Sequence, residues 1–138
     1  MILLIKNARI YAPKELGVKD ILVLNNKIYK IEDKISKGSY VDRVFDASGK
    51  ILTPGFIDQH VHLVGAGGKD GFKSLTPEVN FYDLIKCGTT TAVGLLGTDG
   101  VSKSLNALFA KTKSLNSQGL SSYTVSYTHL RAHETFAN

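Results

Sequence analysis

The sequence predicts an α/β protein in two parts: a small β module over residues 1–53, then alternating strands and helices over 54–124. Three observations predict this. A hairpin signal lies near residue 25, apolar residues recur at helical spacing, and short apolar runs are followed by glycine-rich loops. Alternating β and α units of this length are typical of a parallel sheet covered by helices.

The first part reads as a small antiparallel β module, too small to be stable alone. Pro13 and Gly17 mark a loop after its first strand. The pair Asn25-Asn26 forms the hairpin turn, because asparagine tolerates the positive φ that tight hairpins need. A further turn is expected over residues 47–50. The expected strands are residues 2–11, 21–24, 27–31 and 40–45.

The second part begins with a buried strand over residues 54–63, followed by the glycine loop 65–68. Thr76 is the expected N-cap of the first helix, with proline and glutamate next to it in the first turn. That helix is expected to run to about Cys87 and to stop at Gly88, a typical C′ position.

A second buried strand is expected over residues 90–96, with its loop at 97–100. The second helix ends at Gly119, and a third strand begins over residues 120–123. The apolar face of this helix is expected to contain Leu105, Leu108, Phe109, Thr112 and Leu115.

Two histidines close the strand of the second part, in the sequence Asp58-Gln59-His60-Val61-His62. Alternate side chains of a strand share a face, so His60 and His62 are expected roughly 7 Å apart on one side. Two imidazoles placed in this way can bind one metal ion, and zinc suits them. Asp58 is expected on the same face, supporting the site. The alternative is a pair of ordinary hydrogen-bonded histidines; the apolar run before them and the glycine loop after them favour the metal.

Composition and charge argue against several functions. Basic residues exceed acidic ones by 17 to 12, a net charge of +5. The lysines are scattered among carboxylates and form no stripe, which argues against a nucleic-acid partner. Neither a membrane span nor a secretory signal is recognisable. The single cysteine, Cys87, fits a reducing compartment, so we expect a cytoplasmic protein without a membrane partner.

Residues 46–62 resemble the passage from an N-terminal β-sandwich into the first strand of a TIM-like barrel in the amidohydrolase superfamily. Residues 59–63, 76–79 and 93–99 are similar to the isoaspartyl (β-aspartyl) dipeptidases. The resemblance implies a β-sandwich segment over 1–53. It also implies the first two βα units and the start of the third strand of a (β/α)8 barrel over 54–124. A complete barrel needs about 250 residues, so the barrel is incomplete in this chain.

The resemblance implies a metal-dependent dipeptidase that hydrolyses β-aspartyl dipeptides through a metal-activated hydroxide, with two zinc ions (Zn²⁺) in each active site. His60 and His62 match the first pair of metal ligands. Gly67 and Thr98 match positions that contact the dipeptide substrate.

The remaining machinery of the family comes from later strands: the general base, the bridging carboxylated lysine and two further histidines. No catalytic residue is therefore expected in this chain, which we expect to be inactive alone, whereas the full-length enzyme is expected to form a homo-oligomer. The family often places a glutamate in the glycine loop to hold the α-ammonium group of the substrate. This chain has Lys69 there, with Asp70 beside it.

Residues 125–135 read as the translation of a sequencing-library adaptor, and we interpret 125–138 as an artefact. In this segment His129 and His133 stand four apart, with Glu134 beside them, like a helical metal pair. The adaptor interpretation removes them as candidates.

Two other functions remain open. One is a different amidohydrolase, similar to a dihydropyrimidinase, a dihydroorotase or a deacetylase, acting on a cyclic amide or an N-acyl substrate. The other is a non-catalytic scaffold that kept the fold and lost its metals, against which the presence of both His60 and His62 argues. A stand-alone β-module binding domain would leave the two βα units unexplained.

Overall fold

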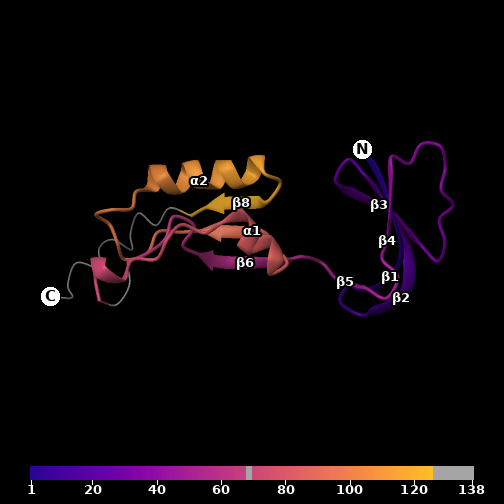
Figure 1. Ribbon diagram of the computed structural model, residues 1–138, viewed down its shortest axis with the longest axis horizontal. Helices are drawn as coiled ribbons and strands as arrows, with labels where there is room; N and C mark the ends of the chain where they lie inside the picture. The colour runs from indigo at the N-terminus through magenta and orange to yellow at the C-terminus, as the bar shows by residue number, and fades with distance from the viewer. Residues whose placement is uncertain (68–69, 126–138) are drawn as a thin grey trace. The chain divides into compact units, whose positions relative to one another are not determined.

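The computed structural model describes residues 1–67 and 70–125. They belong to two compact units, Met1–Pro54 and a second unit that begins at Gly55, drawn in Figure 1. The structure has the mixed α/β class that the sequence predicts, with one sheet in each unit. Within the described ranges, no helix is long and apolar enough to cross a membrane.

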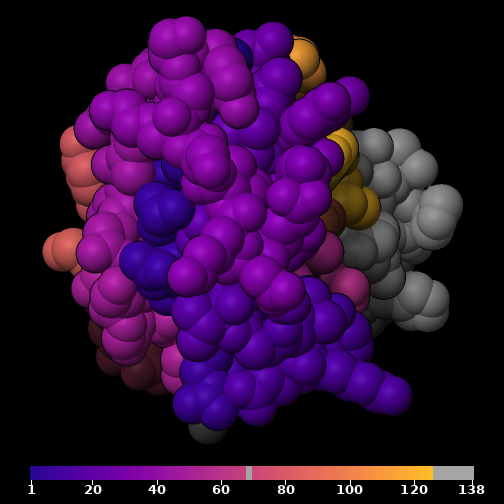
Figure 2. Space-filling view, turned by 90° about the vertical axis from the view of Figure 1, so that its right-hand side faces the viewer, coloured from indigo at the N-terminus to yellow at the C-terminus, as the bar shows by residue number. Residues whose placement is uncertain are grey.

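The first unit contains a single five-stranded sheet in the order β3-β2-β1-β4, with β5 also paired to β1. Residues 1–54 form no second sheet facing it, so the predicted sandwich stays a prediction. Figure 2 shows the surface of this unit in indigo to purple. The strands are β1 (Ile2–Tyr11), β2 (Glu15–Leu24), β3 (Lys27–Glu32), β4 (Arg43–Asp46) and β5 (Ile51–Leu52).

The hairpin of this unit confirms the sequence prediction, because Asn25 and Asn26 have φ angles of 46° and 66° between β2 and β3. Three other expectations were wrong. The module is not purely antiparallel, since β4 and β5 pair in parallel with β1. Strand β4 begins at Arg43 instead of residue 40. Gly17 lies inside β2 opposite Ile10 and not in a loop. Its φ of 78° occurs beside an irregularity in the strand register.

The second unit has a parallel three-stranded sheet in the order β6-β7-β8. Strands and helices alternate along the chain as predicted, with α1 packed on β7 and α2 along β8 (Figure 1). The elements are β6 (Phe56–Val61), η1 (Phe72–Ser74), α1 (Phe81–Lys86), β7 (Thr89–Gly94), α2 (Leu105–Ser117) and β8 (Ser121–Thr124).

Helix α1 begins later than predicted, with Asn80 as its N-cap. The side chain of Asn80 accepts from the N–H of Tyr82 at 2.8 Å. Thr76 cannot cap the helix because it is used elsewhere: its hydroxyl accepts from the N–H of Ala66 at 2.9 Å, and its own N–H donates to the carbonyl of Ala66. The end of the helix confirms the prediction: its last residue is Lys86, Cys87 is the C-cap, and Gly88 follows with a φ of 78°.

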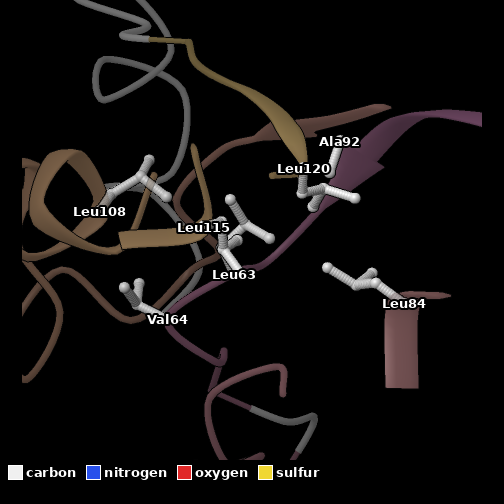
Figure 3. Packing of buried hydrophobic residues seen from close by; sticks show 7 residues of the cluster. All are labelled: Leu63, Val64, Leu84, Ala92, Leu108, Leu115 and Leu120. Atoms are coloured by element: carbon white, nitrogen blue, oxygen red, sulfur yellow. The ribbon is translucent and has the colours of Figure 1, made fainter. Parts of the chain in front are cut away.

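The core of the second unit lies between its sheet and its helices, as Figure 3 shows. Helix α2 contributes Leu108, Thr112 and Leu115, all buried. Leu105 and Phe109, predicted on the same face, are 42% and 55% exposed. The buried stripe of α2 is therefore narrower than the apolar pattern suggests. The buried cluster consists of Leu63, Val64, Leu84, Ala92, Leu108, Leu115 and Leu120.

Strand β6 is not the buried strand that the sequence predicts. Phe56 and Ile57 are 65% and 61% exposed. The reason is topological, because β6 is the edge strand of the sheet formed by the described residues and pairs only with β7.

Candidate functional site

The candidate site lies at the carboxyl ends of the parallel strands β6 and β7. His60 belongs to β6, and His62 follows its last residue directly. The segment after β6 carries Gly67, and the segment after β7 carries Thr98. Because both strands run in the same direction, these two segments emerge at one edge of the sheet, where α/β proteins build their sites.

The two histidine rings lie against each other. Their centroids are 5.3 Å apart and the ring planes meet at 83°. His60 is exposed, whereas His62 is half-buried. The Nδ1 atom of His62 lies 3.2 Å from the carbonyl oxygen of Leu95, just after β7. This contact holds the His62 ring and leaves its Nε2 available to a ligand.

Asp58 does not lie with the histidines as the alternation of a regular strand predicts. Asp58 pairs with Ala92 and Val61 pairs with Gly94, so three steps along β6 match two steps along β7. This irregularity is a β-bulge that places one extra residue in β6 before the site. The Asp58 carboxylate accepts from the backbone N–H of His60 at 3.0 Å instead of from an imidazole.

Glycines allow the two segments to touch. A Cβ atom placed on Gly97 would lie 2.8 Å from the Cβ of Ala66 and 3.5 Å from Cε1 of His62. A Cβ atom placed on Gly67 would lie 3.2 Å from the Cβ of Asp99 and 3.7 Å from the hydroxyl of Thr98. The structure therefore brings Gly67 of the first segment and Thr98 of the second together, and Gly97 close to His62.

Asp99 anchors the segment after β7. Its buried carboxylate accepts from the N–H groups of Val101 and Ser102, at 3.1 and 2.8 Å, and from the Ser102 hydroxyl. The hydrogen bond from Ser102 is the main reason that the pKa of Asp99 lies below its usual value. An ionised Asp99 thus fixes the turn that presents Thr98.

The donor set fits part of a metal site. His60 and His62 offer two neutral nitrogen donors from adjacent rings, the type that zinc prefers. Residues 1–67 and 70–125 contain no cluster of three or more histidine, cysteine or carboxylate side chains able to hold a metal ion. A zinc site takes three or four protein ligands, so these two histidines would make up only a part of one.

Sequence reasoning missed three contributors to this site. The carbonyl of Leu95 contacts His62, Gly97 has no side chain to fill the space between Ala66 and His62, and Asp99 shapes the turn. Only the Asp99-Gly100 pair carries a sequence signal, that of a turn. Lys69 and the residues 126–138 with their two histidines lie outside the described residues.

The chain was compared with protein-family models and with known proteins. No protein-family model matches the chain. It is 39% identical over 102 residues to the dihydroorotase of Listeria innocua, across 72% of this chain and 23% of that protein. With the dihydroorotase of Elusimicrobium minutum the identity is 37% over 109 residues, across 76% and 24% of the two chains.

A solved structure adds a similar fold with higher identity. The chain matches the β-aspartyl dipeptidase of Fervidobacterium islandicum AW-1 with a TM-score of 0.85 and 42% identity, over 91% of this chain and 35% of that one. These similarities support membership of the amidohydrolase superfamily. The chain spans about a quarter of the length of the two dihydroorotases and about a third of that of the dipeptidase.

Proposed function

We propose that the chain is the N-terminal part of a metal-dependent amidohydrolase that hydrolyses β-aspartyl dipeptides. The 42% identity to a β-aspartyl dipeptidase, over 91% of the chain, carries this proposal. The longer protein, called the full-length protein below, would complete a TIM-like barrel and the sandwich around the N-terminal sheet.

In this proposal His60 and His62 bind zinc through nitrogen atoms. The hydrogen bond of His62 to Leu95 supports this role, because it leaves Nε2 free. When bound, two zinc ions supply a Lewis acid and a water of lowered pKa at the amide. Further metal ligands and the general base come from later parts of the full-length protein.

Gly67 and Thr98 are the proposed substrate contacts of this chain. They lie side by side, with the Thr98 hydroxyl 3.7 Å from the position of a Cβ on Gly67. Thr98 is exposed, so its hydroxyl can donate to or accept from a dipeptide. The missing side chain at Gly67 lets a substrate approach the backbone closely.

Dihydroorotase activity is the second candidate. Its support is the sequence identity of 37% to 39% to two dihydroorotases across about three quarters of this chain. A dihydroorotase acts on a cyclic amide, and the same metal chemistry serves both an open and a cyclic amide.

The deciding experiment compares the two substrates on the full-length protein. We expect hydrolysis of β-Asp-Leu, little turnover of dihydroorotate, and zinc in the purified protein. The control carries His60→Ala and His62→Ala together and is expected to lose both zinc and activity. Preference for dihydroorotate would establish the second candidate. A protein without zinc or activity on either substrate would instead indicate a non-catalytic scaffold.

A further inference from the structure

We propose that Asp58 is a positioning residue. It holds the β-bulge that turns His60 and His62 together toward one face of the sheet. The part of this inference that concerns metal rests on the proposed function, whereas the part that concerns the bulge does not.

The register of β6 against β7 shows to which face of the sheet Asp58 points. In a regular parallel pair, residues directly opposite each other point to the same face. Ala92 and Gly94 are two apart in β7 and share a face, so their partners Asp58 and Val61 share it as well. Val61 packs against the buried cluster between sheet and helices, which identifies this face as the helix side.

The face to which the two histidines point follows from this register. His60 precedes Val61 in the strand and therefore points to the face opposite the helices. The contact between the two rings, with centroids 5.3 Å apart, keeps His62 with it. Without the extra residue, a strand that keeps Asp58 opposite Ala92 would turn His60 toward the helix side.

The hydrogen bond of Asp58 to the backbone explains how this residue stabilises the β-bulge. A bulge leaves backbone groups of the extra residue without a partner in the ladder. Neither Gln59 nor His60 has a paired residue on β7. The Asp58 carboxylate accepts from the His60 N–H at 3.0 Å and so satisfies a donor at this irregularity. Aspartate is suited to this because its short side chain bonds the backbone two residues on.

The same geometry separates this role from an electrostatic one. Asp58 lies on the helix side, whereas the histidine rings lie on the other, so its carboxylate does not act by bonding an imidazole. If Asp58 acts by holding the backbone N–H of His60, its effect depends on where its acceptor oxygen lies. If Asp58 acts through its negative charge, its effect depends on the carboxylate being ionised.

The test uses three variants of the full-length protein: Asp58→Ala, Asp58→Asn and Asp58→Glu. Asparagine keeps the acceptor without the charge, and glutamate keeps the charge but moves the acceptor by one methylene. The matched control is Asp46→Ala, because Asp46 in the first unit accepts from the N–H of Ser48, also two residues on and at 3.0 Å. Two readouts are measured: amide hydrogen exchange at His60, and affinity in a titration with zinc alone.

We expect Asp58→Ala and Asp58→Glu to speed exchange at His60 and to weaken zinc binding by roughly 10–100-fold. Asp58→Asn and Asp46→Ala should keep the affinity within about 3-fold of the original protein. Loss of affinity in Asp58→Asn together with full affinity in Asp58→Glu would overturn the proposal in favour of a charge effect. Unchanged exchange in Asp58→Ala would overturn it outright.

The outcomes also separate this inference from the proposed function. An original protein that binds no zinc contradicts the proposed function, while exchange at His60 still tests the bulge. If Asp58→Ala fails to fold, the comparison of Asp58→Asn with Asp58→Glu decides, because both retain a polar side chain at this position.

Discussion

The imidazole of His62 is held by a backbone carbonyl of the neighbouring strand end: its Nδ1 lies 3.2 Å from the oxygen of Leu95. A carbonyl oxygen only accepts hydrogen bonds, so Nδ1 must carry the proton. The unprotonated nitrogen is then Nε2, the form in which a neutral imidazole binds a metal.

We therefore expect His62 of the metal-free full-length protein to be the Nδ1–H tautomer at mildly alkaline pH. Nitrogen-15 NMR distinguishes the two ring nitrogens, and added zinc should shift the Nε2 signal of His62. His60 is the internal comparison, because its ring has no hydrogen bond to any residue in the described part of the chain. A proton found on Nε2 of His62 would contradict the orientation described here.

Gly97 leads to a second prediction, because it leaves no room for a side chain between the two segments of the site. The Cβ of an alanine there would meet Ala66 at 2.8 Å and His62 at 3.5 Å. We expect Gly97→Ala to cost about 1–3 kcal/mol of stability through overpacking against Ala66. Zinc binding should weaken as well, because the clash with Ala66 displaces the segment that also carries His62.

Gly100 provides the matched control for this change. It follows in the same loop, and a Cβ placed on it meets nothing within 4 Å. Gly100→Ala should leave both the urea midpoint and the zinc affinity close to those of the original protein. Equal effects of the two substitutions would show that loop flexibility matters, and not the contact with Ala66.

The sequence could predict the pair of histidines but not the position of Asp58 relative to them. Strand alternation is a local property and places His60 and His62 correctly on one side. The face to which Asp58 points depends on its partner in β7. That partner, Ala92, lies more than thirty residues later in the chain, so local sequence does not reveal the pairing. The N-cap is a similar case, since Thr76 is hydrogen-bonded to Ala66, ten residues earlier, and Asn80 caps the helix instead.

The buried carboxylate of Asp20 is expected to make the stability of the first unit depend on pH. It is 1% exposed and accepts from the Lys6 ammonium at 2.8 Å and from the N–H groups of Asn7 and Ile35 at 2.8 and 2.9 Å. Burial alone would raise the pKa of Asp20, but these hydrogen bonds outweigh it and hold the pKa below its usual value.

A carboxyl whose pKa is lowered by folding stabilises the protein above its unfolded pKa, and this contribution disappears as the pH falls through the folded pKa. Asp20→Asn should therefore cost about 2–3 kcal/mol near neutral pH. The gap to the original protein should narrow below about pH 4. Urea unfolding at several pH values measures this.

Asp33→Asn is the comparison for this prediction. Asp33 pairs with Lys19 on the surface, with 85% of its side chain exposed, so its substitution should change stability little at any pH. If Asp20→Asn shows the same small, pH-independent effect, the buried hydrogen bonds of Asp20 do not stabilise the fold.

Neighbouring residues of α2 test which face of this helix is buried. The apolar spacing predicted both Leu108 and Phe109 in the core, but Leu108 is fully buried and Phe109 is 55% exposed. Leu108→Ala removes a side chain from the closed cluster of the second unit and should cost about 2–5 kcal/mol. Phe109→Ala should cost less than about 1 kcal/mol, because the ring keeps much of its contact with water. Urea midpoints of the two variants provide the measurement. A larger loss from Phe109→Ala would mean that the rest of the full-length protein covers the outer face of α2.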